Sequence, residues 1–129
     1  MSHLDALKAE IISDGRISSR HVKQIRALIF TDAIVDRRAA IDLFEINDAI
    51  GHGGTADWTR LFVDGIGRHV LEDPDSPGKI DEDEAEFLRA SILRDGQIDD
   101  AERALLTHLR LKADVIHERL LDVMGELGI

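Results

Sequence analysis

The chain has 129 residues, no cysteine and a formal net charge of −10 at pH 7. This length fits a single domain, 1–129, whose hydrophobic core is large enough to be stable without disulfides or structural metal ions. The lack of cysteine excludes disulfides and thiolate zinc sites. The acidic balance argues against a nucleic-acid partner, because neutralising phosphates needs a basic face.

Neither a secretory signal nor a membrane span is visible in the sequence. The N-terminal segment MSHLD, 1–5, lacks a basic stretch followed by an apolar run, and no other stretch is apolar for long enough to cross a bilayer. The absence of cysteine is compatible with a reducing compartment. We therefore expect a cytoplasmic protein with no membrane partner.

Apolar residues recur at three- and four-residue steps almost throughout, which predicts an all-α fold of about seven helices with little room for a sheet. The break GHGG at 51–54 separates the third and fourth helices, and Pro74 and Pro77 end the fourth. In chain order, the helices are marked by Leu4 to Ile12, Val22 to Phe30, Ile41 to Ile50, Trp58 to Val70, Phe87 to Ile92, Leu105 to Leu109 and Val115 to Leu127. Trp58 is expected in the core.

Four turns between these helices share one sequence pattern. Two turn-forming residues are followed by an aliphatic residue and then by a small or acidic residue. The copies are DGRIS at 14–18, DAIVD at 32–36, PGKID at 77–81 and DGQID at 95–99. The first two copies map onto the last two at an offset of 63 (78 − 15). This spacing predicts two similar helical half-repeats, approximately 1–50 and 55–127.

Helix termination and capping give the turns a structural explanation. Glycine can adopt the left-handed conformation that closes one helix, and the following Ser18, Asp36, Asp81 or Asp99 can accept hydrogen bonds from free amides at the start of the next. Asp81-x-x-Glu84 and Asp99-x-x-Glu102 have the spacing of a capping box. The aliphatic residue of each turn is expected to anchor it in the core.

The third turn lies within DPDSPGKIDEDE, 73–84, which resembles an EF-hand calcium loop. Asp73, Asp75, Asp81 and Glu84 stand at the first, third, ninth and twelfth places, Gly78 at the sixth, and Lys79 at the seventh, where a backbone carbonyl binds. Only the fifth place departs, since Pro77 has no side-chain oxygen. The predicted metal ligands are Asp73, Asp75, Lys79, Asp81 and Glu84.

Four carboxylates in one short loop repel one another unless a positive partner intervenes, and a hard divalent cation supplies it. We expect Ca²⁺, with Mg²⁺ as the alternative, bound in the weak range of about 10⁻⁵ to about 10⁻³ M because one ligand is missing. Against this stand two observations. Acidic, proline-containing loops are often merely solvated. EF-hand loops ordinarily occur in pairs, and the turn at 95–99 is a poor second loop because Ser91 and Leu93 stand where the first two acids belong.

The chain as a whole resembles the TerB-like tellurite-resistance family, a bacterial group of helical domains built around such turns. The segments DGRI at 14–17 and DGQIDDAE at 95–102 carry the resemblance. It implies a weaker set of metal-binding candidates at Asp14, Asp32, Asp36, Asp95, Asp99 and Glu102. The sequence departs from a symmetric pattern at Ala33, which replaces glycine, and at His21, where other turns offer glutamate.

Enzymatic motifs are absent: there is no nucleophile elbow, phosphate-binding loop or His-Glu-x-x-His helix. A non-enzymatic interaction or adaptor module with purely structural turns is therefore the alternative to a cation-binding protein. Six basic residues between Arg16 and Arg38 and eight acids between Glu72 and Glu86 could pair within one molecule, with a protein partner or in a homodimer. Simple solvation of both segments is the favoured explanation.

Overall fold

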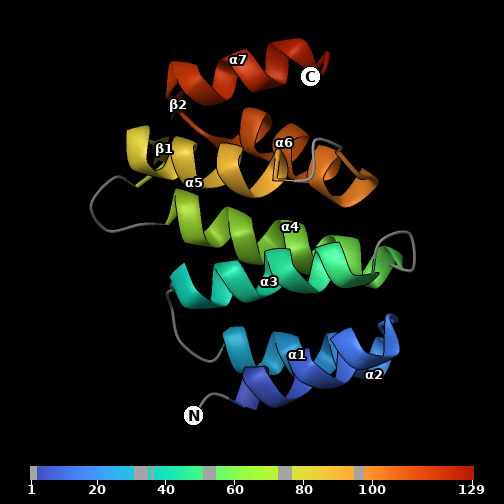
Figure 1. Ribbon diagram of the computed structural model, residues 1–129. Helices are drawn as coiled ribbons and strands as arrows, with labels where there is room; N and C mark the ends of the chain where they lie inside the picture. Colours follow the sequence, from blue (N-terminus) through green and yellow to red (C-terminus); the bar gives the residue numbers. More distant parts are fainter. Residues whose placement is uncertain (1–2, 31–34, 36, 51–54, 73–76, 95–97) are drawn as a thin grey trace.

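The computed structural model describes residues 3–30, 35, 37–50, 55–72, 77–94 and 98–129, with side chains from residue 6 onward. In these ranges the chain forms seven α-helices and two very short strands (Figure 1), so the predicted all-α fold is confirmed. The elements are α1 (His3–Asp14), α2 (Ser19–Ile29), α3 (Arg37–Ile50), α4 (Ala56–Leu71), β1 (Lys79–Ile80), α5 (Glu82–Ile92), α6 (Asp100–Lys112), β2 (Val115–Ile116) and α7 (Glu118–Glu126).

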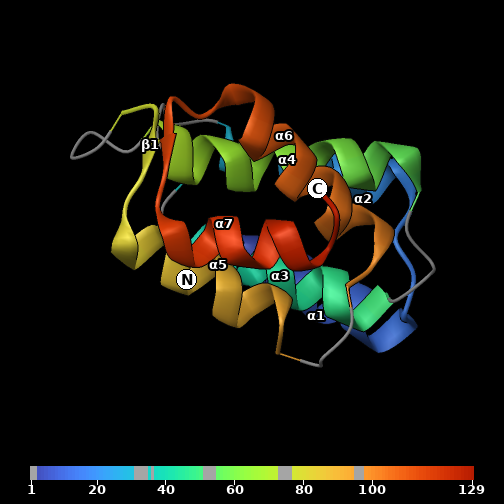
Figure 2. The same cartoon turned by 90° about the horizontal axis from the view of Figure 1, so that it is seen from above.

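The helices are arranged in two layers, which are seen from above in Figure 2. Helices α2, α4 and α6 lie along one side, and α1, α3, α5 and α7 lie along the other. Within the layers α4 packs on both α2 and α6, α1 packs on α3, and α5 packs on α7. Contacts of α1 with α2 and of α3 with α4 join the two layers.

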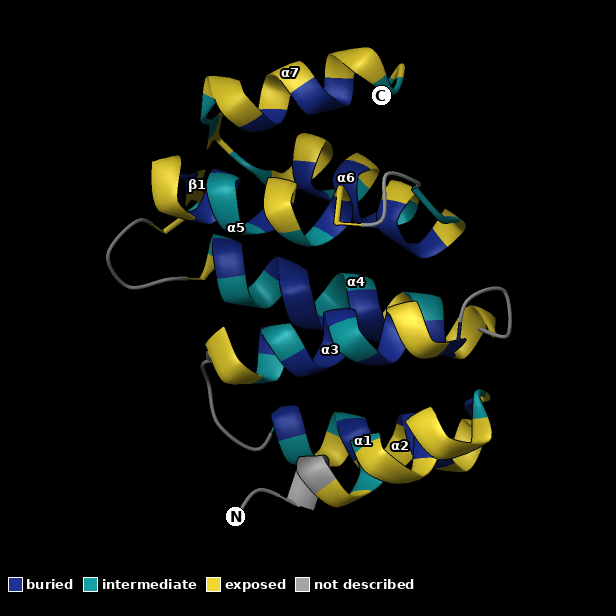
Figure 3. Cartoon of the chain, in the orientation of Figure 1, coloured by how far each residue is buried: buried dark blue, intermediate teal, exposed yellow. Residues whose placement is uncertain are grey.

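Buried and exposed residues follow one another along the helices (Figure 3). Along α4, Leu61, Phe62 and Ile66 are completely buried, and Trp58 is 1% exposed, as expected for a core residue. The Phe62 ring packs edge-on against Phe44 of α3, with ring centroids 5.2 Å apart. Burying each such side chain stabilises the fold by about 1.5 to 3 kcal/mol. Because α4 packs on α2, α3 and α6, it lies at the centre of the core.

The two short strands depart from the predicted elements. Val115 and Ile116 were expected to begin the last helix, but they form β2, which pairs in parallel with β1. The register places Lys79 opposite Val115 and Ile80 opposite Ile116. The prediction for these two residues is wrong because β-branched side chains suit an extended backbone, and α7 starts only after the cap residue His117.

Helix starts in the two halves of the chain follow the spacing predicted from the turns. Helices α2 and α5 begin at residues 19 and 82, and α3 and α6 begin at residues 37 and 100, an offset of 63 in both cases (82 − 19 and 100 − 37). The common offset reflects equal helix and turn lengths. Duplication of a structural unit, with half-repeats near 1–50 and 55–127, stays a prediction.

Candidate functional site

The structure describes the last eight of the twelve residues of the predicted calcium loop, 77–84. Asp73 and Asp75 lie outside the described residues, whereas Lys79, Asp81 and Glu84 lie within them. Lys79 belongs to β1, and Asp81 and Glu84 stand at the start of α5. The lysine side chain is exposed and Glu84 is only 3% exposed.

A bend at Gly78 leads the chain from α4 into β1. Gly78 has a φ of +74°, in the left-handed region that glycine adopts without strain. Its amide donates to the Leu71 carbonyl at 2.7 Å, and its own carbonyl accepts from the Asp114 amide at 2.7 Å. A Cβ at this position would lie 2.8 Å from Asp114 Oδ2, so the Asp114 carboxylate would have to shift, but it is the backbone conformation that requires glycine.

Asp81 and Glu84 form the capping box that their spacing predicted. Asp81 Oδ1 accepts from the Glu84 amide at 2.9 Å, and Glu84 Oε1 accepts from the Asp81 amide at 3.2 Å. These bonds satisfy amides that the first turn of α5 leaves free. Both carboxylates are thus held at the end of the loop, where their negative charge also complements the helix dipole.

The weaker candidate set is spread over several turns. Asp14 is exposed at the end of α1, while Asp32, Asp36 and Asp95 lie outside the described residues. Asp99 and Glu102 form a second capping box, with Asp99 Oδ1 accepting from the Glu102 amide at 2.8 Å. Among the described residues no group of three or more His, Asp or Glu side chains is close enough to hold a metal ion.

Asp99 also closes a chain of side-chain hydrogen bonds that sequence reasoning missed. Its Oδ2 accepts from Asn47 Nδ2 at 2.7 Å, and Asn47 Oδ1 accepts from Trp58 Nε1 at 3.0 Å. Asn47 and Trp58 are both buried, so their polar groups need these partners. The chain links α3, α4 and the start of α6, and it gives Asp99 a clear structural role.

The first turn repeats the capping box with a histidine in place of glutamate. Ser18 Oγ accepts from the His21 amide at 3.3 Å, and the Ser18 amide donates to His21 Nδ1 at 3.3 Å. The buried ring places Nε2 at 3.5 Å from Glu10 Oε1 on α1. The departure at His21 therefore preserves the cap, and it replaces a carboxylate that could bind a cation.

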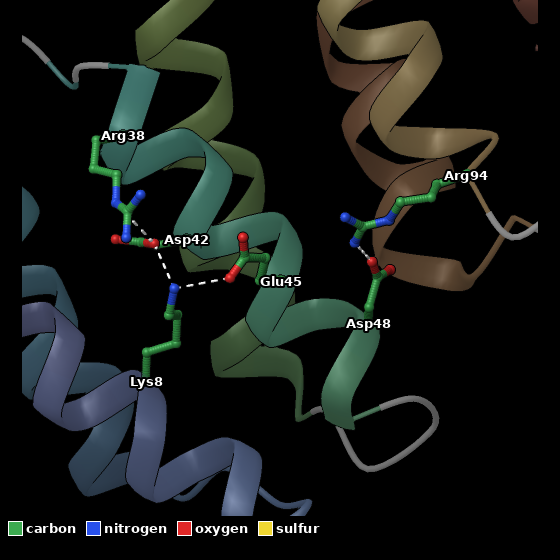
Figure 4. A network of polar contacts seen from close by, with 6 residues as sticks. All are labelled: Lys8, Arg38, Asp42, Glu45, Asp48 and Arg94. Atoms are coloured by element: carbon green, nitrogen blue, oxygen red, sulfur yellow. Dashed lines mark hydrogen bonds and ion pairs between the residues drawn. The ribbon is translucent and has the colours of Figure 1, made fainter.

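A second unpredicted network ties α1 to α3 (Figure 4). Lys8 Nζ donates to Asp42 Oδ1 and to Glu45 Oε2, each at 2.8 Å, and Arg38 Nε lies 3.5 Å from the same Asp42 oxygen. Asp42 is only 1% exposed, so its charge depends on these cations. Farther along α3, Asp48 pairs with Arg94, which follows α5.

The carboxylates around Lys8 alter its titration. Burial by itself lowers the pKa of Lys8, but hydrogen bonds to Asp42 and Glu45 and the negative charge of both carboxylates outweigh it, so the pKa is raised above the ordinary 10.5. Lys8 therefore stays protonated throughout the neutral range. The ammonium occupies the space between the two carboxylates, so they are not available to an added metal ion.

Comparisons with family models, with curated proteins and with solved structures found no match to this chain. None of the helices in the described ranges combines the length and the apolar character needed to cross a bilayer.

Proposed function

We propose that this chain is a small, non-enzymatic helical protein that binds a divalent cation in the loop 73–84. The ion is Ca²⁺, with Mg²⁺ as the alternative, and the ligands are the side chains of Asp73, Asp75, Asp81 and Glu84 with the carbonyl of Lys79. The observation that carries the proposal is the left-handed Gly78 at the sixth place of the loop, where calcium loops need glycine for a sharp turn.

Capping in the described part of the loop supports cation binding. It holds the Asp81 and Glu84 carboxylates in place, which lowers the entropic cost of ordering two ligands. A hard divalent cation bound by oxygen ligands offsets the repulsion among the four carboxylates of the loop.

The proposal includes membership of the TerB-like family, a bacterial source, a cytoplasmic location and an association with stress such as tellurite. The support is the set of Asp-Gly turns quoted from the sequence, which stand between helices in the structure where those turns are described. Asp14, Asp99 and Glu102 are weaker cation ligands in this proposal, because Asp99 and Glu102 already serve as helix caps.

An adaptor that binds another protein or a second copy of itself is the competing function. The capping boxes favour it, because they explain Asp81, Glu84, Asp99 and Glu102 without any ligand. Exposed apolar side chains on β2 and the end of α6 offer contact area: Leu111 is 78% exposed and Val115 54% exposed. Isolated exposed apolar residues are also normal on protein surfaces.

Calorimetric titration with CaCl₂ separates the two functions, and the two capping boxes provide a matched pair of variants. Glu84→Gln and Glu102→Gln each remove one charge but keep an oxygen that can accept the capping hydrogen bond. We expect saturable heat in the parent chain and in Glu102→Gln, and at least about tenfold weaker binding in Glu84→Gln.

If the parent chain gives no saturable heat, the cation-binding function is rejected and the adaptor function remains. Equal weakening by both substitutions would instead indicate diffuse attraction to an acidic protein. If only Glu102→Gln weakens Ca²⁺ binding, the cation site lies at the fourth turn, 95–99. Repeating the titration with MgCl₂ identifies the preferred ion, because Mg²⁺ requires a stricter octahedral geometry than Ca²⁺.

A further inference from the structure

A groove of about 630 Å³ opens on the face formed by α2, α4 and α6. Among the described residues, Arg26 and Phe30 of the α2 end, Arg68 and Leu71 of α4, and His108 and Lys112 of α6 contribute to its lining. The volume is within the range of small-molecule sites. Cations and apolar groups thus share one concave surface on a chain whose net charge is −10.

Phe30 holds the two arginines of the groove in place. The Arg68 guanidinium carbon lies 4.5 Å from the centroid of the Phe30 ring, and that of Arg26 lies 5.3 Å from it. Stacking on an aromatic ring favours a guanidinium electrostatically and restricts its motion. Both groups are therefore preorganised at the groove before any ligand arrives.

The acids of the groove do not neutralise its cations completely. Arg26 Nη2 lies 3.4 Å from Asp64 Oδ2, and Arg68 Nε lies 3.1 Å from Glu72 Oε2, but a guanidinium has five N–H donors. Lys112 has no carboxylate within 4.0 Å among the residues that the structure describes. These pairs are half-exposed, so an incoming anion can share the donors at low cost.

Gly67 brings α6 close enough for His108 to reach the groove. A Cβ at Gly67 would lie 3.2 Å from His108 Cδ2 and from His108 Nε2. The absence of a side chain at this position lets the imidazole ring lie against the α4 backbone, where it can offer a ring nitrogen to a ligand.

Two smaller hollows continue the groove along the same face, and both are lined by Asp64. One lies between α4 and α6 and also includes His108, and the other lies between α2 and α4 and also includes Arg26. Over the three hollows, five permanent cations (Lys23, Arg26, Arg60, Arg68 and Lys112) face three carboxylates (Asp57, Asp64 and Glu72). The combined lining of the three hollows is therefore net positive.

We propose that this groove binds the oxyanion group of a small organic ligand, a phosphate or a carboxylate attached to an apolar body. Arg68 and Lys112 donate to the oxyanion, because charge-assisted hydrogen bonds from these side chains are the strongest available here. The apolar body lies on Phe30 and Leu71. This site is separate from the loop 73–84 and does not depend on cation binding there.

Titration of the full chain with phenyl phosphate, inorganic phosphate and phenylacetate, followed by calorimetry and by the His108 ring resonances, tests the proposal. We expect saturable binding of at least one aromatic anion, and weaker binding of inorganic phosphate because it lacks the apolar body. A preference for phenyl phosphate identifies the oxyanion as phosphate, and a preference for phenylacetate identifies it as carboxylate.

Substitutions of both signs make the test specific. Lys112→Gln should weaken binding about tenfold, whereas Arg110→Gln, an exposed cation on the same helix outside the groove lining, should not. Glu72→Gln frees Arg68 and should strengthen binding, whereas Glu126→Gln on α7 makes the same charge change far along the chain and should have no effect.

The proposal is overturned if none of the three anions gives a saturable signal. It is also overturned if Arg110→Gln weakens binding as much as Lys112→Gln, or if Glu126→Gln strengthens it as much as Glu72→Gln, since binding would then follow net charge alone.

Discussion

Asp81 and Asp99 occupy equivalent positions in two turns, but their contacts differ. Each accepts a hydrogen bond from an amide at the start of a helix, while Asp99 also accepts from the buried Asn47. Asp81 is exposed and Asp99 is partly buried. Removing the two carboxylates should therefore have unequal effects on the free energy of unfolding.

We expect Asp81→Ala to cost about 1 kcal/mol, the usual value of an N-cap, and Asp99→Ala to cost about 2 to 3 kcal/mol. The extra cost arises because Asn47 Nδ2 loses its acceptor in a buried site. Urea denaturation of both variants measures the difference. A cost of no more than about 1 kcal/mol for Asp99→Ala would mean that the bond between Asn47 and Asp99 adds nothing to stability.

The local sequence predicts what depends on local geometry. Three capping residues, Ser18, Asp81 and Asp99, were identified correctly because the cap depends on residues three positions apart. The aliphatic residues Ile17, Val35 and Ile80 are buried as expected, whereas Ile98 is half-buried. Contacts between distant residues have no such signature, so the bond from Asn47 to Asp99 was missed.

At the scale of elements, Lys8 connects α1 to α3 through salt bridges with Asp42 and Glu45. The lysine is 14% exposed, Asp42 is 1% exposed, and the two residues are 34 positions apart in the sequence. A lysine and two acids at this separation give no pattern that predicts their pairing, and an acid within the apolar face of a helix is unexpected. Only the crossing of α1 over α3 brings them together.

Lys8→Met should destabilise the protein by about 3 kcal/mol, because among the described residues the buried Asp42 carboxylate keeps only Arg38, at 3.5 Å. As the matched control, Arg20→Met removes a cation from the exposed pair with Glu10 and should cost at most about 1 kcal/mol. Denaturant midpoints compare the two. A Lys8→Met variant as stable as Arg20→Met would show that α1 is held by its apolar contacts alone.

The raised pKa of Lys8 also predicts how stability depends on pH. A group whose pKa is higher in the folded state stabilises the fold fully below its unfolded value, about 10.5, and loses this contribution as pH rises through the folded value. The parent chain should therefore lose more stability than Lys8→Met between pH 9 and about pH 12. Parallel slopes in the two proteins would contradict the pairing, since their other lysines are identical.

At the scale of the whole molecule, the periodicity of apolar residues predicted the fold class but not the arrangement of helices. It identifies the buried face of each helix, as at Leu61, Phe62 and Ile66 of α4, without indicating which helix covers that face. The layer of α2, α4 and α6, and the basic groove on it, therefore emerge only from the structure. The acidic loop and the basic groove are separate features of one acidic chain.

The central claim is that the loop 73–84 holds a divalent cation, and amide resonances followed during a calcium titration test it most directly. We predict saturating shifts confined to the loop, including Gly78, Asp81 and Glu84, half complete between about 10⁻⁵ and about 10⁻³ M, weakened in Glu84→Gln and retained in Glu102→Gln. If the Gly78 and Glu84 resonances stay fixed up to about 10 mM Ca²⁺, the carboxylates at this turn only cap α5.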